Sequence, residues 1–360
     1  MRRNKVKSLK RSLLYKDTKA RRSEYERADV YSYLEVYMMS ETLLDVRNLH
    51  TYFYTIKGVV RAVDNVSFSL RKGEVLGIAG ESGCGKSTTA YSIIRLVPPP
   101  GRIVKGEIYF EGKDVLKMSK EEFRTKIRWK KISMVFQGAM NALNPVHKVG
   151  DQIAEVLVLH ENMTKKEAYE KVQELLQMVG IDPRRANSYP HELSGGMKQR
   201  VLIAMALALN PPLVIADEPT TALDVVVQAQ IMNLLKRLQK EHGMSIILIT
   251  HDLSLIAEIA NKVAIMYAGK IVELGSAEQI YYNPHHPYTR GLLASIPRIK
   301  GEISKLEWIP GVPPDLRNPP LGCRFHPRCK YKFAPCDKEE PPLVEVEPGH
   351  YVACWLYAKR

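Results

Sequence analysis

The 360-residue sequence contains only five cysteines and no long uninterrupted apolar stretch. A transmembrane helix needs roughly 18 continuous apolar residues. The best candidate, VLIAMALAL at residues 201–209, stops at an asparagine and two prolines. We therefore expect any role at a membrane to depend on partner proteins that span it. The apolar share of 45% is still enough to fill a sizeable core, which excludes a disordered chain.

Acidic residues are also in short supply, since 39 Asp and Glu stand against 53 Lys and Arg and leave a net charge of +14. An excess of this kind is typical of proteins that meet nucleic acid or anionic lipid. Much of it lies within the first 30 residues. We therefore interpret residues 1–40 as a basic, solvated tail, with contact to a membrane surface as the alternative.

The N-terminal segment lacks the marks of a secreted protein. Its apolar run, SLLY, is too short for a signal peptide, and no small-residue cleavage site follows it. We expect the chain to stay in the cytosol, where structural disulfides are rare. Clustered cysteines in that compartment indicate a metal site or catalysis.

The pattern of apolar residues predicts an α/β fold with three parts. Short β-rich runs between residues 43 and 114 predict an antiparallel β subdomain. Buried-strand runs such as EVLGIAG, PLVIAD and SIILIT alternate with helical stretches, as a parallel α/β sheet requires. We place this core at residues 41–280, an inserted helical subdomain at about 145–210, and a small, irregular, proline-rich C-terminal module at 281–360.

The sequence GESGCGKS at residues 80–87 fits the G-x-x-x-x-G-K-[ST] pattern of a phosphate-binding loop. A strand run precedes it and a helical run follows. In such loops backbone amides and the positive helix end attract phosphate, the lysine reaches the β- and γ-phosphates, and the hydroxyl ligates Mg²⁺. We expect ATP to bind Ser82, Gly83, Cys84, Gly85, Lys86, Ser87 and Thr88.

A second acidic element follows in LVIADE at residues 213–218. An apolar strand that ends in two acids predicts that Asp217 joins Ser87 in the Mg²⁺ shell. The adjacent Glu218 is the candidate general base for the attacking water. Between this element and the phosphate-binding loop lies LSGGMKQR at residues 193–200.

LSGG followed by a polar and basic run resembles the signature of ABC transporter ATP-binding subunits. The resemblance implies an ABC ATPase core. It also implies that Gln137 in MVFQ is the Q-loop glutamine and a further Mg²⁺ ligand, that TALD at 221–224 is the D-loop, and that His251 in LITHD is the switch histidine. On this resemblance the expected catalytic residues are Glu218, His251, Gln137 and Lys86.

The same resemblance implies a head-to-tail pair of ATP-binding subunits. Ser194, Gly195 and Gly196 of the signature would then face the ATP held by the partner. An aromatic ring for the adenine is expected shortly before the first glycine turn. Phe53, between Tyr52 and Tyr54, is the choice by spacing, and the alternative is that this run belongs to the core of the sheet.

The other four cysteines gather near the C-terminus. Cys323, Cys329, Cys336 and Cys354 are separated by five, six and seventeen residues, without the C-x-x-C pair usual for structural zinc. Four thiolates suit an iron–sulfur cluster as well as zinc, so the spacing leaves both open.

Stretches at residues 283–297, 309–316 and 322–329 resemble the C-terminal extension of oligopeptide and dipeptide importer ATPases. Some members of that subfamily carry a [4Fe-4S] cluster on cysteines so spaced. The resemblance therefore favours a cluster over Zn²⁺, in a role that is structural and separate from hydrolysis. We expect His285, His286 and His326 to be turn or surface residues outside the metal site.

The sequence as a whole predicts an ATPase on the cytoplasmic face of the cell membrane that energises import of oligopeptides or dipeptides. Importers of this type also take sugars and nickel, so peptide is a starting expectation. The resemblance implies three kinds of partner: a paralogous ATP-binding subunit in a heterodimer, two transmembrane permease subunits and, indirectly, an extracellular substrate-binding protein.

Two other function classes compete with an importer. The first is a soluble ABC-type ATPase acting on nucleic acid or ribosomes, for which the basic tail argues. Such proteins commonly carry two cassettes, whereas this chain has one phosphate-binding loop and one signature, so no nucleic-acid partner is expected. The second, a non-catalytic iron–sulfur protein, leaves Glu218 and His251 unexplained.

Overall fold

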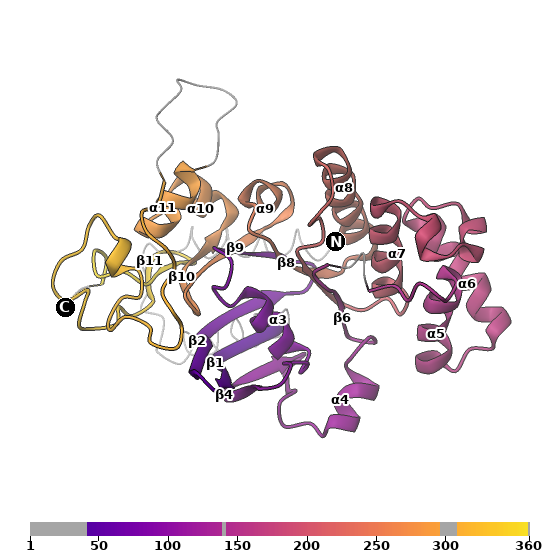
Figure 1. The fold of residues 1–360 in the computed structure, drawn as a ribbon, viewed down its shortest axis with the longest axis horizontal. Helices are drawn as coiled ribbons and strands as arrows, with labels where there is room; N and C mark the ends of the chain where they lie inside the picture. The colour runs from indigo at the N-terminus through magenta and orange to yellow at the C-terminus, as the bar shows by residue number, and fades with distance from the viewer. Residues whose placement is uncertain (1–41, 139–141, 296–307, 359–360) are drawn as a thin grey trace, which may run out of the picture. The chain divides into compact units, whose positions relative to one another are not determined.

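The computed structural model describes residues 42–138, 142–295 and 308–358. The basic tail predicted at 1–40 lies outside these residues. Leu43–Arg360 groups into one compact unit. In Figure 1 the chain of this unit runs from the indigo strands of its first sheet to the yellow C-terminal extension.

The first sheet has four strands in the order β2-β1-β4-β5. β1 pairs with β4, and β4 with β5, in antiparallel register. Alternate residues in the second half of β2, among them Val66, Phe68 and Leu70, are buried, as a sheet with one face on the core requires. The strands are β1 (Thr42–Thr55), β2 (Gly58–Arg71), β4 (Gly101–Phe110) and β5 (Lys113–Asp114).

The second sheet has eight strands in the order β11-β12-β10-β9-β3-β8-β7-β6. Five consecutive strands of this order, from β9 to β6, pair in parallel. Nearly all of their residues are buried, which explains why they read as continuous apolar runs. These strands are β9 (Lys262–Tyr267), β3 (Val75–Ala79), β8 (Ser245–Ile249), β7 (Leu213–Asp217) and β6 (Ile132–Val135).

Most helices begin where the sequence supplies a cap. Side chains of Ser119, Thr164, Ser194, Asp224 and Ser276 each accept a backbone N–H of the first turn. The helices are α3 (Lys86–Ile93), α4 (Lys120–Lys126), α5 (Val149–Glu161), α6 (Lys165–Met178), α7 (Gly195–Leu207), α8 (Val225–His242), α9 (Leu253–Ile259), α10 (Ala277–Tyr282) and α11 (Pro287–Ala294). Of these, α5, α6 and α7 pack on one another within the block predicted at about 145–210 (Figure 1).

The C-terminal extension adds strands to the eight-stranded sheet. The prediction of an irregular module did not include these strands. β10 (Lys270–Ser276) pairs antiparallel with both β9 and β12 (His350–Val352). β12 in turn pairs with β11 (Val344–Glu347). A sheet edge carries unpaired N–H and C=O groups. The β11–β12 hairpin covers that edge of β10, and so the extension packs as part of the core unit.

A buried ion pair fastens the extension to the first sheet. The Arg324 guanidinium contacts the Asp64 carboxylate of β2 and also donates to the carbonyl of Ala268. Tyr52 Oη donates to Asp64 at 2.8 Å, and Lys270 Nζ lies 4.0 Å from the same carboxylate. Burial alone would raise the pKa of Asp64, but these partners outweigh it and lower the pKa. The carboxylate is therefore ionised and paired at neutral pH.

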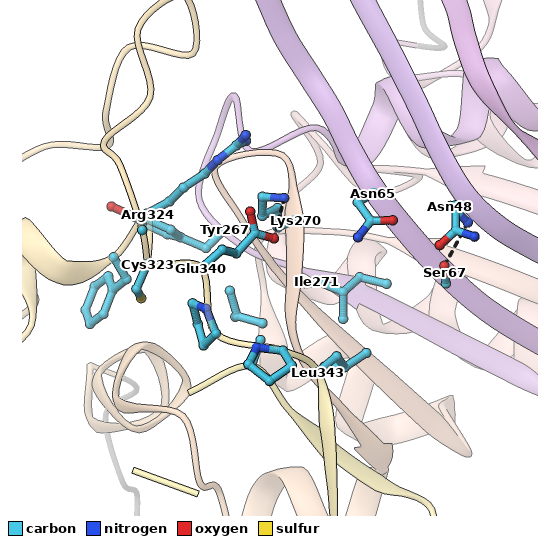
Figure 2. A pocket seen from close by; sticks show the side chains of 16 residues that line it. Asn48, Asn65, Ser67, Tyr267, Lys270, Ile271, Cys323, Arg324, Glu340 and Leu343 are labelled. Atoms are coloured by element: carbon cyan, nitrogen blue, oxygen red, sulfur yellow. Dashed lines mark hydrogen bonds and ion pairs between the residues drawn. The ribbon is translucent and has the colours of Figure 1, made fainter. Parts of the chain in front are cut away.

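A cavity of about 230 Å³ lies beside this ion pair, where β2, β10 and the extension meet (Figure 2). Asn65 and Ser67 of β2 and Ile271 of β10 form part of its wall, and Leu343 of the extension faces them. Lys270, another lining residue, pairs with Glu340 at 2.7 Å. The junction is thus held by charged groups whose partners come from distant parts of the chain.

Replacing Arg324 by Met should destabilise the protein by about 3 kcal/mol, because removing one partner leaves the other buried charge poorly compensated. Tyr52 and Lys270 remain beside Asp64, so the loss should lie at the lower end of the range for buried pairs. Urea unfolding measures it. The matched control is Arg317→Met, since Arg317 pairs with Asp315 at the surface, where solvent screens the pair, and its loss should change the stability far less than the loss of Arg324. Equal losses in both variants would contradict the anchoring role.

Candidate active site

The GESGCGKS loop runs from the end of β3 into α3, as predicted. Gly83 and Gly85 have positive φ values of 80° and 106°, a conformation that L side chains rarely adopt. A Cβ at Gly85 would lie 2.2 Å from the carbonyl oxygen of Ala62. Ser82 and Gly83 are exposed at the loop, while Ser87 and Thr88 lie in the first turn of α3. The loop therefore leads to a helix N-terminus, whose free amides attract anions.

Lys86 lies inside this loop and is only 6% exposed. Its Nζ donates to the carbonyls of Gly80 at 2.7 Å and Glu81 at 3.0 Å, and lies 3.7 Å from Cys84 Sγ. A positive charge is thereby held within the turn that is predicted to bind phosphate. Cys84 is buried, and burial raises the pKa of its thiol, so this cysteine packs in the loop as a neutral side chain.

Two of the predicted Mg²⁺ ligands meet at the C-terminal ends of the central strands. Ser87 Oγ donates to Asp217 Oδ1 at 3.0 Å. Asp217 Oδ2 is buried and has no hydrogen-bond partner. Burial, and secondarily the charge of Glu218, raise the pKa of Asp217 to about 6. A hydroxyl beside an unpartnered carboxylate oxygen is a hard oxygen donor set, so these residues fit Mg²⁺.

Glu218 gathers the other predicted catalytic residues around its carboxylate. Oε2 accepts hydrogen bonds from Gln137 Nε2 at 2.8 Å and from Thr221 Oγ1 at 2.9 Å, and Oε1 lies 3.3 Å from His251 Nδ1. The backbone is fixed as well: Glu218 has a φ of 46°, and its N–H donates to the carbonyl of Ile249. Gln137, predicted as a third Mg²⁺ ligand, thus contacts Glu218, and its role at the metal stays a prediction.

The surroundings of Glu218 favour its charged form. Partial burial would raise the pKa of its carboxyl, but the hydrogen bonds from Thr221 and His251 and the charges of His251 and Lys86 lower it overall. An ionised carboxylate is the form that a general base needs. The geometry therefore suits proton abstraction from a water held near Oε1 or Oε2.

The signature lies at the start of α7, whereas the phosphate-binding loop lies at the start of α3 (Figure 1). Ser194 caps α7 by accepting the Met197 N–H at 3.3 Å, and Gly195 and Gly196 form its first turn. A Cβ at Gly196 would lie 2.6 Å from Val227 Cγ1. Within the described residues, no hydrogen bond or ion pair connects Ser194 with the loop. Its predicted contact with a partner's ATP stays a prediction.

The three aromatic residues before the glycine turn differ in their surroundings. Phe53 is half-buried on β1 and lies against Gly101 of β4, where an added Cβ would come within 2.7 Å of Phe53 Cε1. Tyr52 is tied to Asp64 by its hydroxyl, and Tyr54 is 48% exposed. Part of this run is therefore structural, and adenine stacking on Phe53 stays a prediction.

The sequence did not reveal a link between the extension and the phosphate-binding loop. Arg328 donates to both carboxylate oxygens of Glu81, at 2.6 Å and 2.9 Å. The N–H of Glu81 donates to Tyr288 Oη of α11 at 2.9 Å. The only sequence signal that could have drawn attention to Arg328 is its position directly before Cys329. Its distance of 247 residues from Glu81 hides the pairing from motif reading.

Comparison with known proteins decides the family. A model of the ABC transporter family matches residues 63–221, and one of the oligopeptide/dipeptide transporter C-terminal region matches 272–336. The oligopeptide transport ATP-binding protein OppD of Bacillus subtilis is 53% identical over 319 residues, which cover 87% of this chain and 88% of OppD. The chain belongs to the oligopeptide/dipeptide family of ABC transporter ATP-binding proteins.

Further relatives agree with this assignment. The dipeptide transport ATP-binding protein DppD of B. subtilis is 50% identical, over 89% of this chain and 96% of DppD. Escherichia coli OppD is 49% identical, over 88% of this chain and 94% of its own length. The predicted recognition of the family is confirmed over both the core and the extension.

The fold of this ABC ATPase also matches solved structures. The dimeric ATP-binding cassette MJ0796 in a post-hydrolysis state with ADP and phosphate is 31% identical, with a TM-score of 0.59, over 65% of this chain and 99% of that one. The predicted ABC cassette fold and ATPase class are confirmed, while the metal-binding property of the extension stays a prediction. No helix in the described part of the ABC ATPase is long and apolar enough to cross a membrane.

Replacing Glu218 by Gln should leave ATP binding intact and slow hydrolysis about 10²- to 10³-fold, because the amide keeps the shape but cannot accept the proton of water. Nucleotide binding and steady-state phosphate release measure the two effects. Glu241→Gln is the matched control, since Glu241 is exposed at the end of α8. Normal turnover in Glu218→Gln would remove this residue from the catalytic group.

Replacing Asp217 by Asn should stabilise the protein in the absence of Mg²⁺ at neutral pH. The pKa of Asp217 is about 6 in the folded state against an ordinary 3.8. The folded state therefore resists ionisation, and wild-type stability falls as pH rises from about 4 to 6, by about 3 kcal/mol in all. Asn lacks this pH-dependent loss.

Urea unfolding of wild type and Asp217→Asn between about pH 4 and 7 tests the sign, with Glu241→Gln as control. The stability difference between Asp217→Asn and wild type should grow with pH, and Mg²⁺ should bind the variant more weakly. A difference that shrinks as pH rises would show that the Asp217 carboxylate is stabilised by its surroundings.

Proposed function

We propose that this ABC ATPase energises the uptake of oligopeptides or dipeptides. The observation that supports the substrate class most directly is the match of the C-terminal region at 272–336, joined to a cassette whose relatives are named for oligopeptide and dipeptide transport. The acidic and basic groups of the cassette would hydrolyse ATP, and this reaction would drive the uptake. Substrate selection belongs to partner proteins.

ATP hydrolysis is proposed to use the groups described above in distinct roles. Lys86 and the loop amides would hold the β- and γ-phosphates, and Ser87 and Asp217 would hold Mg²⁺, which would screen the negative charge of the phosphates. Glu218 accepts a proton from the water whose oxygen attacks the γ-phosphorus, and the bond from that phosphorus to the β-phosphate oxygen breaks. His251 and Gln137 fix the Glu218 carboxylate through their contacts with it.

A second ATP-binding subunit is proposed to complete each site. Ser194 is exposed at the N-terminus of α7, where a helix dipole favours a phosphate group. A related cassette is known as a dimer. Together these support a head-to-tail pair, with a paralogous chain as the proposed partner. Two permease subunits would carry the substrate across the membrane and hold this chain at its cytoplasmic face, and an extracellular binding protein would deliver the substrate.

A [4Fe-4S] cluster is proposed for the extension. Cys323, Cys329, Cys336 and Cys354 line one small cavity. Burial, and secondarily the neighbouring thiols, raise the pKa of Cys323 to about 12 and that of Cys354 to about 11. Thiols packed this closely need bound cations to ionise together, and the donor set suits iron–sulfur or zinc. The resemblance of the extension to that of oligopeptide and dipeptide importer ATPases, some of which carry such a cluster, favours it over zinc.

The test of transport uses cells from which the gene has been deleted. Uptake of a labelled dipeptide and of a labelled tetrapeptide should be lost, and should return with the wild-type chain but not with Lys86→Ala. In purified complexes, ATPase activity should require both ATP-binding chains. Any activity of this chain purified without its partners should fall per molecule as the protein is diluted. Normal peptide uptake combined with lost sugar or nickel uptake would overturn the substrate class.

Cys329→Ser should remove iron and brown colour from anaerobically purified protein, which should otherwise hold about four irons per chain. Loss of the cluster should also loosen the extension, because folding of a metal-dependent segment is linked to its metal. Cys84→Ser is the matched control and should keep its iron. Stoichiometric zinc without iron in the wild type would refute the cluster in favour of the zinc alternative.

A further inference from the structure

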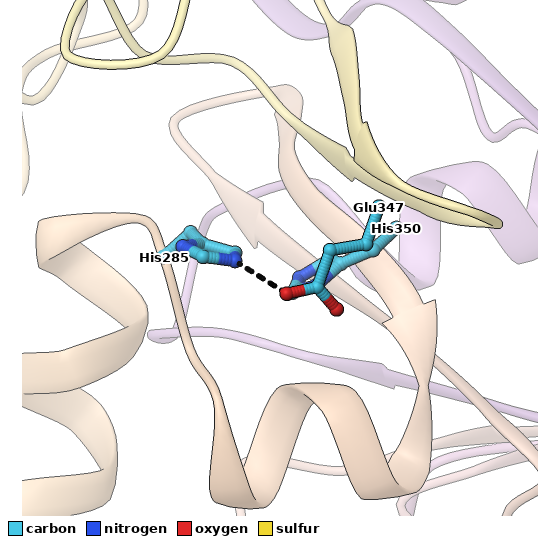
Figure 3. Close-up of side chains that lie close together, drawn as sticks. All are labelled: His285, Glu347 and His350. Carbon is cyan, nitrogen blue, oxygen red and sulfur yellow. Dashed lines mark ion pairs between the residues drawn. The ribbon is translucent and has the colours of Figure 1, made fainter.

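The extension contains a second group of metal-ligand side chains with a different donor set. Donor atoms of His285, Glu347 and His350 lie within 4.8 Å of one another (Figure 3). His285 Nε2 is 3.5 Å from Glu347 Oε1, and His350 Nδ1 is 4.0 Å from Glu347 Oε2. The carboxylate thus lies between two imidazoles. Neither the nucleotide site nor the four cysteines uses these groups.

The fold brings the three residues together from two segments. Glu347 ends β11 and His350 begins β12, and the two are paired across the hairpin. His285 lies in the segment between α10 and α11, and its side chain points toward Glu347 (Figure 3). The expectation that His285 is a plain turn residue therefore missed its neighbours, because Glu347 follows 62 residues later in the sequence.

His350 presents an unsatisfied lone pair toward this group. Its Nε2 lies 2.8 Å from Glu273 Oε1, and both side chains are completely buried. Glu273 also accepts the backbone N–H groups of His285 at 2.7 Å and His286 at 3.0 Å, so the carboxylate is an acceptor on every side. In the neutral ring Nε2 then carries the proton, which leaves Nδ1 as an acceptor. That Nδ1 is buried and has no hydrogen-bond partner.

His285 is oriented in the same sense. The amide nitrogen of Asn283 lies 2.6 Å from Glu347 Oε1 and 3.5 Å from His285 Nε2. In the tautomer with its proton on Nδ1, His285 presents Nε2 as an acceptor to this N–H donor. The ring of His285 is held between those of His350 and Tyr357, each with its centroid 4.8 Å away. Two imidazole nitrogens and a carboxylate thus surround one point, where a cation would be bound favourably.

We propose that His285, Glu347 and His350 bind a divalent transition-metal cation of the zinc type. Two imidazoles and one carboxylate are a recurrent zinc donor set, whereas Mg²⁺ and Ca²⁺ prefer all-oxygen sites. Ligand atoms about 2.1 Å from a tetrahedral ion lie about 3.4 Å apart. The donor atoms all lie within 4.8 Å of one another, so they must close by up to about 1.4 Å around the ion. Water completes the coordination after the Asn283 amide turns aside.

Glu273 supports the site from behind His350. A carboxylate that holds the second ring nitrogen of a ligating histidine fixes its tautomer and raises its basicity. The cation would join the β11–β12 hairpin to the segment before α11 and thus hold the extension on β10. The role that follows is structural, and a cation bound only by the folded chain stabilises it by mass action.

The experiment titrates Co²⁺ into the full chain, purified anaerobically so that the cysteines keep their own occupant. One equivalent should bind with weak visible bands and without the strong near-ultraviolet thiolate-to-cobalt bands that binding at the cysteines would give. Glu347→Gln should weaken Co²⁺ binding at least 100-fold, and Glu273→Gln about 10- to 100-fold. The matched control Glu345→Gln, also on β11, should bind as the wild type does.

Thermal unfolding with and without Zn²⁺ gives a second readout. Zn²⁺ should raise the Tm of the wild type and of Glu345→Gln, but not that of Glu347→Gln. If Glu347→Gln fails to fold, His285→Gln replaces it, with His242→Gln at the end of α8 as its control. Cobalt binding with thiolate bands only, or equal affinity in Glu347→Gln and wild type, would overturn the proposal.

Discussion

The parallel register of β7 and β8 is the constraint on which the candidate ATPase site depends. Asp217 pairs with Ile249 at the ends of these strands, so the residues that follow, Glu218 and His251, emerge side by side. The N–H of Glu218 donates to the Ile249 carbonyl, which carries the strand pairing one step further and holds the positive φ of Glu218. A residue in that conformation is strained, and the strain is tolerated because both flanking strands are buried.

Charge is distributed unevenly over the two neighbouring carboxylates. Asp217 is buried with one unpartnered oxygen, and the pKa of its carboxyl is raised, whereas Glu218 accepts several hydrogen bonds, and the pKa of its carboxyl is lowered. Two adjacent acids with opposed environments suit two roles, a cation ligand and a proton acceptor. The difference comes from burial and hydrogen bonding, since the two side chains share the same functional group.

The sequence could predict the parts of this site that depend on local chemistry. The phosphate-binding loop, the strand ending in Asp217 and the alternation of strands and helices follow from spacing and apolar runs, and the structure places them as expected. Contacts between distant segments were beyond it. Arg328 with Glu81, Arg324 with Asp64 and the β11–β12 hairpin on β10 depend on how the extension folds back, which no local pattern encodes.

Those long-range contacts alter the picture of an extension whose metal site is separate from hydrolysis. Arg324 and Arg328 stand within the interval from Cys323 to Cys329, so ligation of both cysteines would fix the short segment that carries both arginines. Arg328 is the bidentate partner of Glu81, a residue of the phosphate-binding loop. A bidentate arginine–carboxylate pair fixes direction as well as distance. Disorder in the cysteine segment would therefore reach Glu81 of the loop directly through one side chain. The independence of hydrolysis from the metal site stays a prediction, and this ion pair is the contact through which it would fail.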